Sequence, residues 1–211
     1  SLMAALYSKT KMSEEYRIQP FEMKNIPHIL DVVVPLWSPP TGDPDFKRFN
    51  VEYIIRNNLF ENELHYQLVD EKNQYCASAF FARKGEICKA EDWFAIESKK
   101  YSEELLISSE MSRAYIEMMD KKTFEMMNQN DIKLTLYISS KKGCGSKLLN
   151  ELCRGFKKQG YKKLYLWTDC ECNWEWYTNH GYELVSEDVY EPYSSDDEDY
   201  MTYVFRKELQ A

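Results

Sequence analysis

The sequence has little glycine and little proline, with seven of each among its 211 residues. Chains made mainly of linkers, low-complexity segments or collagen-like repeats are much richer in these two residues. Long apolar runs are also missing, since none approaches the roughly 18 residues that a membrane-spanning helix needs. What remains is a globular composition with 44% hydrophobic and 15% aromatic residues. The length favours one domain, which we place at residues 15–211 behind a disordered leader or tag at residues 1–14.

Positive charge is in deficit, because 27 Lys and Arg residues face 35 Asp and Glu residues, a formal net charge of -8. An excess of negative charge disfavours binding to phosphate backbones, so we expect no nucleic acid partner. We also expect no membrane partner. The excess is concentrated in residues 187–200, which contain no Lys or Arg. The acidic residues there are Glu187, Asp188, Glu191, Asp196, Asp197, Glu198 and Asp199.

Histidine is scarce, and the three histidines are scattered among six cysteines. Cys170 and Cys172 are close together, but a zinc site usually adds a second cysteine pair or nearby histidines. We therefore expect no metal and interpret the cysteines as reduced thiols in a cytoplasmic protein.

The periodicity of apolar residues predicts an α/β chain. Expected strands are residues 15–19, 64–69, 75–83, 132–139, 163–168, 182–190 and 201–206. Expected helices are residues 24–37, 51–59, 146–159 and 173–180, with a proline-rich break at 38–44. Residues 98–130 form a helical insertion, and its methionine-rich stripe is interpreted as core cover rather than as a groove for a partner.

The segment Lys141 to Ser146 joins an expected strand to the following helix. In such a strand-helix-strand unit the carboxyl end of the first strand meets the amino end of the helix, where ligands tend to bind. Gly143 and Gly145 allow close approach to the backbone, and the helix terminus favours an anion. Two lysines make a diphosphate the better candidate. The P-loop and dinucleotide-binding patterns are both absent.

Two motifs resemble one known family. Ser140-Lys141-Lys142-Gly143-Cys144-Gly145 is similar to the [RQ]-x-x-G-x-[GA] fingerprint of the GNAT superfamily of N-acetyltransferases, with Ser140 in place of the Arg or Gln. Asn173 to Tyr182 is similar to the second signature of that family. The resemblance implies a mixed, mostly antiparallel sheet of about seven strands flanked by helices, with the helical insertion before the fourth strand.

The resemblance also implies acetyl-coenzyme A as cofactor and transfer of its acetyl group to a primary amine of a small molecule or peptide, by direct attack in a ternary complex. Tyr177 would be the general acid, because a phenol of pKa about 10 is protonated at neutral pH. Asp169 and Glu91 are the candidate bases. The implied cofactor-binding residues are Tyr137, Ile138, Ser139, Lys141, Lys142, Gly143, Cys144, Gly145, Ser146, Asn173 and Tyr177.

Other functions stay open at this point. The chain could be a non-catalytic acyl-coenzyme A sensor or scaffold, or could transfer another acyl group or acetylate a hydroxyl. Residues 187–200 would lie beside the acceptor and attract a polyamine, an aminoglycoside-like amine or a basic peptide terminus, or would simply be a solvated loop. Residues 37–44 are a second candidate wall of the acceptor site. A homodimer is an expectation of the resemblance alone.

Overall fold

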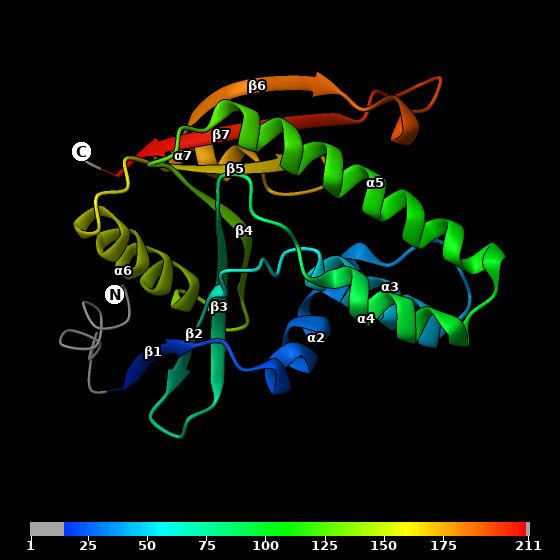
Figure 1. Cartoon of the computed structure of the whole chain (residues 1–211), viewed down its shortest axis with the longest axis horizontal. Coiled ribbons are helices and arrows are strands. Elements are labelled where there is room, and N and C mark those ends of the chain that lie inside the picture. Colours follow the sequence, from blue (N-terminus) through cyan, green and yellow to red (C-terminus); the bar gives the residue numbers. More distant parts are fainter. Residues whose placement is uncertain (1–14, 210–211) are drawn as a thin grey trace.

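The computed structural model describes residues 15–209 and contains one seven-stranded sheet in the order β1-β2-β3-β4-β5-β7-β6 (Figure 1). Every neighbouring pair is antiparallel except β4 with β5, so the expected mostly antiparallel sheet is confirmed. The strands are β1 (Tyr16–Pro20), β2 (Leu64–Asp70), β3 (Tyr75–Arg83), β4 (Ile132–Ser139), β5 (Lys163–Asp169), β6 (Glu183–Val189) and β7 (Met201–Glu208). The expected leader at residues 1–14 lies outside the described residues.

Helices cover both faces of the sheet. They are α2 (Ile26–Trp37), α3 (Pro44–Arg56), α4 (Ala90–Glu97), α5 (Glu103–Met126), α6 (Cys144–Lys158) and α7 (Glu175–Asn179). Because α4 and α5 lie between β3 and β4, the expected helical insertion before the fourth strand is confirmed. Within residues 15–209, no helix combines the length and the apolar character that crossing a bilayer requires.

Helix α3 begins at Pro44, seven residues earlier than the expected helix at residues 51–59. Asp43 caps its amino end, where the carboxylate accepts a hydrogen bond from the Phe46 amide at 3.0 Å. Proline suits the first helical position because its missing N–H would have had no partner there. The proline-rich segment therefore ends where α3 begins, at Pro44, and the expected helix start at residue 51 was wrong.

Strands β4 and β5 separate after a short contact. They pair only at Ile132 with Leu164 and at Lys133 with Tyr165. Beyond these pairs β4 remains bonded to β3, while β5 remains bonded to β7 along its whole length. The two halves of the sheet consequently diverge toward the carboxyl ends of β4 and β5, as Figure 1 shows. This wedge positions the candidate site.

Helix α5 packs over the half of the sheet that contains β5 and β7. Tyr115 and Met119 are buried there in one apolar cluster with Tyr165 and Val204. Met118 and Met119 of the methionine-rich stripe thus cover core, whereas Met111, nearer the amino end, is 45% exposed and lines the cavity described below.

Candidate functional site

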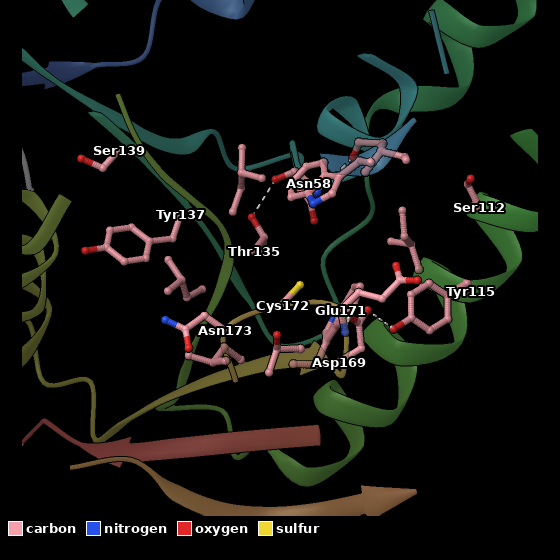
Figure 2. A pocket seen from close by; sticks show the side chains of 18 of the residues that line it. Asn58, Ser112, Tyr115, Thr135, Tyr137, Ser139, Asp169, Glu171, Cys172 and Asn173 are labelled. Carbon is pink, nitrogen blue, oxygen red and sulfur yellow. Dashed lines mark hydrogen bonds between the residues drawn. The ribbon is translucent and has the colours of Figure 1, made fainter. Parts of the chain in front are cut away.

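A cavity of about 960 Å³ occupies the region of the wedge. It is lined by residues of α2 and the loop that follows it, α3, α5, β4, the β4–α6 turn, β5, α7 and the segment before it, and the β6–β7 connection. Figure 2 shows Tyr137 and Ser139 on one side of the cavity, Tyr115 and Ser112 on the opposite side, and Cys172 between them. The first side belongs to the end of β4, next to the glycine-containing turn, and the opposite side belongs to α5.

The two glycines of the turn have different roles. Gly143 adopts a left-handed φ of 84°, and a Cβ built on it would meet nothing within 4 Å. A Cβ on Gly145, in contrast, would come within 2.8 Å of the Tyr137 hydroxyl and 3.0 Å of the Ser139 Cβ. Gly145 therefore permits the close packing of α6 on β4, whereas Gly143 leaves its face open to a ligand.

The amino end of α6 has the features of an anion site. Its N-cap residue, Gly143, supplies no side-chain cap, and no acidic residue lies in the first turn. Two amides of the first turn have partners within the protein, since Cys144 donates to the Lys141 carbonyl at 3.2 Å and Gly145 to the Ser139 hydroxyl at 3.1 Å. The positive end of the helix dipole still favours an anion at this position. Lys142 lines the cavity and forms no ion pair within residues 15–209, while Lys141 pairs with Asp70 at 3.2 Å. These groups fit a pyrophosphate.

Strand β4 contains a bulge that sequence reasoning missed. Phe80 pairs with Leu136 but Phe81 pairs with Leu134, so Thr135 is an extra residue, and its hydroxyl donates to the Asn58 carbonyl at 2.8 Å. Strict alternation would keep residues 132, 134, 136 and 138 on one face. Instead Leu134 packs in the cluster with α6, whereas Leu136 packs in the cluster with α2 and α3. The bulge turns Tyr137 toward α6. Because apolar and polar residues alternate regularly through this strand, the sequence gives no sign of the bulge.

Asn173 and Tyr177 both line the cavity. Helix α7 begins only at Glu175, so Asn173 precedes the helix instead of opening it. The Tyr177 ring packs against Tyr182 and Phe205 at centroid distances of 5.2 and 5.5 Å. Burial, followed by the nearby Cys172 thiol, raises the pKa of Tyr177 well above its ordinary value of 10. The hydroxyl forms no hydrogen bond within residues 15–209, and its proton is available for transfer.

Asp169 ends β5 with its carboxylate buried in the cavity wall. The residue is 6% exposed, and it accepts hydrogen bonds from the Tyr115 hydroxyl at 2.6 Å and from the Glu171 amide at 3.1 Å. No Lys or Arg of the described chain forms an ion pair with it. Burial and then the Asp169 charge raise the pKa of Tyr115 far above its ordinary value, so this phenol stays a donor.

The remaining sequence-predicted residues divide into two groups. Glu91 does not line the cavity, since its carboxylate accepts from the Tyr53 hydroxyl at 2.9 Å and pairs with Arg113 at 3.4 Å. The side chains of Ile138 and Cys144 are buried in the core, which leaves only their backbone groups for a ligand. The structure brings the others together around the cavity: Tyr137, Ser139, Lys141, Lys142, Gly143, Gly145, Ser146, Asp169, Asn173 and Tyr177.

Residues 187–200 contribute aromatic side chains to the cavity, not acidic ones. Tyr193 and Tyr200 are part of the lining, whereas none of the seven acids of this segment is. Sequence reasoning noticed the acids and missed these tyrosines, as it missed Tyr115 on α5. The tyrosines are visible in the segment, but nothing local indicates that they meet α5.

No protein-family model matches this chain, and a search of curated protein sequences found no similar one. Several solved structures have the same fold. The ribosomal-protein-S18-alanine N-acetyltransferase from Escherichia coli aligns over 93% of this chain and 95% of its own, with 12% identity and a TM-score of 0.51. A mosquito arylalkylamine N-acetyltransferase (like 5b) aligns over 92% and 99%, with 11% identity and a TM-score of 0.50.

The C-terminal condensation domain of Ebony, solved with beta-alanyl-dopamine, covers 92% of this chain and 98% of its own, with 11% identity and a TM-score of 0.57. These likenesses concern architecture, since all three identities are low. The chain therefore has the fold of the GNAT-type N-acetyltransferases.

Proposed function

We propose that this protein is an acetyl-coenzyme A-dependent N-acetyltransferase that acts on a primary amine. The observation that carries the proposal is that one continuous cavity in the β4–β5 wedge joins the amino end of α6 to the side chains of Tyr177 and Asp169. The same cavity thus offers an anion site, a protonated acid and a carboxylate to one bound pair of reactants.

Cofactor binding is assigned to the turn and to β4. Lys142 and the positive end of the α6 dipole would hold the pyrophosphate, and Gly143 leaves the space that this contact needs. The edge of β4 beyond Lys133 has no strand partner on the side of β5, so its backbone groups are available to the amides of the pantetheine arm. When bound, acetyl-coenzyme A supplies a thioester acetyl group.

The chemistry is assigned to two side chains. Tyr177 donates a proton to the departing sulfur, and its raised pKa keeps the phenol protonated throughout the neutral and mildly alkaline range. Asp169 is the carboxylate of the cavity wall that receives the ammonium of the acceptor and accepts its proton. Glu91 is assigned no role in this proposal, because its carboxylate accepts from the Tyr53 hydroxyl and is not part of the cavity lining.

A non-catalytic module that only binds acyl-coenzyme A is the second candidate, and transfer of another acyl group is the third. The Ebony domain illustrates that this fold is not restricted to acetyltransferases. Catalysis is favoured because a binding module has no need for both a buried carboxylate, Asp169, and a tyrosine with a free hydroxyl, Tyr177, in the lining of one cavity. The reaction is placed in the cytoplasm, where the six free cysteines would remain reduced.

The proposal is tested by thiol release from acetyl-coenzyme A with an amine panel, with mass spectrometry of the products. Tyr177→Phe is expected to lower kcat about 100-fold, because loss of a general acid typically costs 10² to 10⁴. Tyr182→Phe is the matched control, since this neighbouring tyrosine is buried but does not line the cavity. Absence of any acetylated amine contradicts the function, and full kcat in Tyr177→Phe contradicts the assigned acid.

A further inference from the structure

Four aromatic side chains form one wall of the cavity on the α5 side. Tyr115 comes from α5, Trp167 from β5, and Tyr193 and Tyr200 from the β6–β7 connection, and all four line the cavity. The Tyr115 ring centroid lies 5.0 Å from Tyr193, 5.4 Å from Trp167 and 6.0 Å from Tyr200. Tyr193 and Tyr200 are 5.2 Å apart. We call these four residues the aromatic chamber.

Asp169 lies against the aromatic chamber through its bond with the Tyr115 hydroxyl, which Figure 2 shows. Burial and then the Asp169 charge raise the pKa of Tyr200 as well, so both phenols remain neutral donors beside the carboxylate. A buried carboxylate without a cationic partner is costly unless a counter-charge arrives. A ligand ammonium supplies that counter-charge, and the faces of Tyr and Trp rings attract it further.

The charges of the cavity lining are separated. Its basic residues are Lys141 and Lys142, in the turn before α6, and its acidic residues are Asp169 and Glu171, at the end of β5. Figure 2 places Ser139, the strand residue before the turn, on the side away from Tyr115. An acceptor that carries a carboxylate would therefore meet two acids and no base beside the chamber. An extended polycation would find only two acids and an aromatic wall.

From this arrangement we infer that the acceptor is a primary ammonium on an apolar, aromatic body that carries no carboxylate. Its ammonium lies at Asp169, and its body packs in the aromatic chamber. The inference rests on the proposed function for the transfer step, but amine binding can be measured without it. It also gives residues 187–200 an aromatic role, in place of the charge attraction expected from their sequence.

The test combines binding and turnover with four probes. 2-Phenylethylamine fits the chamber, phenylalanine adds a carboxylate to the same body, spermidine is a polycation without a ring, and 2-phenylethanol lacks the ammonium. Wild-type protein is expected to bind 2-phenylethylamine at least about tenfold more tightly than the other three, a difference that one desolvated charge pair can supply. The same order is expected for kcat/KM with acetyl-coenzyme A.

Asp169→Asn is expected to weaken 2-phenylethylamine binding at least about tenfold and to leave the Kd of acetyl-coenzyme A unchanged. The control is Asp196→Asn with Asp197→Asn, which removes two exposed charges of residues 187–200 outside the lining. If Asp169→Asn does not fold, the half-buried Tyr193 provides a second variant, and Tyr193→Ala is expected to weaken 2-phenylethylamine binding in the same way.

The inference is overturned if phenylalanine, spermidine or 2-phenylethanol binds as tightly as 2-phenylethylamine. It is also overturned if Asp169→Asn and Tyr193→Ala both bind 2-phenylethylamine like wild type. It also fails if acetyl-coenzyme A binds and 2-phenylethylamine does not, an outcome that leaves the proposed function standing. If 2-phenylethylamine binds through Asp169 but acetyl-coenzyme A does not bind, the inference stands and the proposed function fails.

Discussion

Cys172 is the cysteine whose side chain lines the cavity within the described part of the chain. Cys172 is exposed by its surface area, but partial desolvation of its sulfur, followed by the charge of Asp169, raises the pKa of the thiol above its ordinary value. The thiolate is the nucleophilic form of cysteine, so a thiol held protonated at neutral pH is a poor attacking group. Direct attack by the amine in a ternary complex is therefore expected, instead of an acetyl-cysteine intermediate.

Cys172→Ala should retain kcat within about twofold, since the residue carries no covalent step. Initial rates varied in both substrates should give intersecting lines, and Cys170→Ala serves as a matched control outside the cavity lining. Parallel lines in the wild type together with loss of activity in Cys172→Ala would overturn direct transfer.

His65 gives the fold a sensitivity to acid. Its buried imidazole accepts a hydrogen bond from the Phe60 amide at Nε2, 3.1 Å away, and burial lowers its pKa from 6.5 to about 4. Because the folded pKa is the lower one, the stabilisation is complete above pH 6.5 and is lost as pH falls toward 4. About 3 kcal/mol of unfolding free energy should disappear over this interval.

Urea unfolding of the wild type and of His65→Gln, at steps from pH 7 to pH 4, measures this loss. The glutamine side chain can still accept from the Phe60 amide but does not titrate, so the loss should be smaller by about 3 kcal/mol. His28→Gln, at an exposed position, should behave like wild type. Equal pH dependence in wild type and His65→Gln would contradict the assignment.

At the scale of the element, α5 is anchored to the sheet by a buried charge pair. The Lys133 ammonium, fully buried on β4, lies 2.9 Å from the Asp120 carboxylate on α5, which also accepts from the Trp167 indole at 2.8 Å. Both partners lie near the point where β4 and β5 separate. The pair thus ties the inserted helix to the apex of the wedge.

Removing one partner of a buried ion pair leaves the other charge buried without a counter-charge. Asp120→Ala should therefore lower the unfolding free energy by about 3 to 5 kcal/mol, measured by urea unfolding at pH 7. Glu125→Ala, an exposed position on the same helix, should change it by less than about 0.5 kcal/mol. A loss in Asp120→Ala no larger than in Glu125→Ala would show that the pair contributes nothing.

The periodicity predicted most elements because their apolar residues face one covered side. The periodicity failed where the position of a residue depends on contacts with residues that are distant in the sequence. The Thr135 bulge preserves regular alternation in the sequence, and only the register with β3 reveals it. The start of α3 was missed for a local reason, since Asp43 followed by Pro44 is a capping signal that the nearby prolines obscured.

At the scale of the whole molecule, sequence reasoning located one half of the candidate site. The turn around Gly143 and the Asn173 and Tyr177 pair are local motifs, and the structure gathers them around one cavity. The aromatic chamber is built from α5, β5 and the β6–β7 connection, which are distant in the chain. Its composition depends on how the insertion packs, and no local pattern encodes that packing.

The central claim is that acetyl-coenzyme A binds with its pyrophosphate at the β4–α6 turn. Isothermal titration of wild type, Gly143→Asn and Gly143→Asp tests it most directly. Both side chains tolerate the left-handed φ of 84° at residue 143, and they differ in charge. Gly145 is unsuitable, because any Cβ there would strike Tyr137 and disturb the packing of α6.

We expect wild type to bind acetyl-coenzyme A and Gly143→Asp to bind it at least about tenfold more weakly than Gly143→Asn, the size expected for one repulsive charge near a diphosphate. Thermal unfolding confirms in parallel that both variants are folded. A wild type that does not bind acetyl-coenzyme A, or equal binding by the two variants, would contradict the claim.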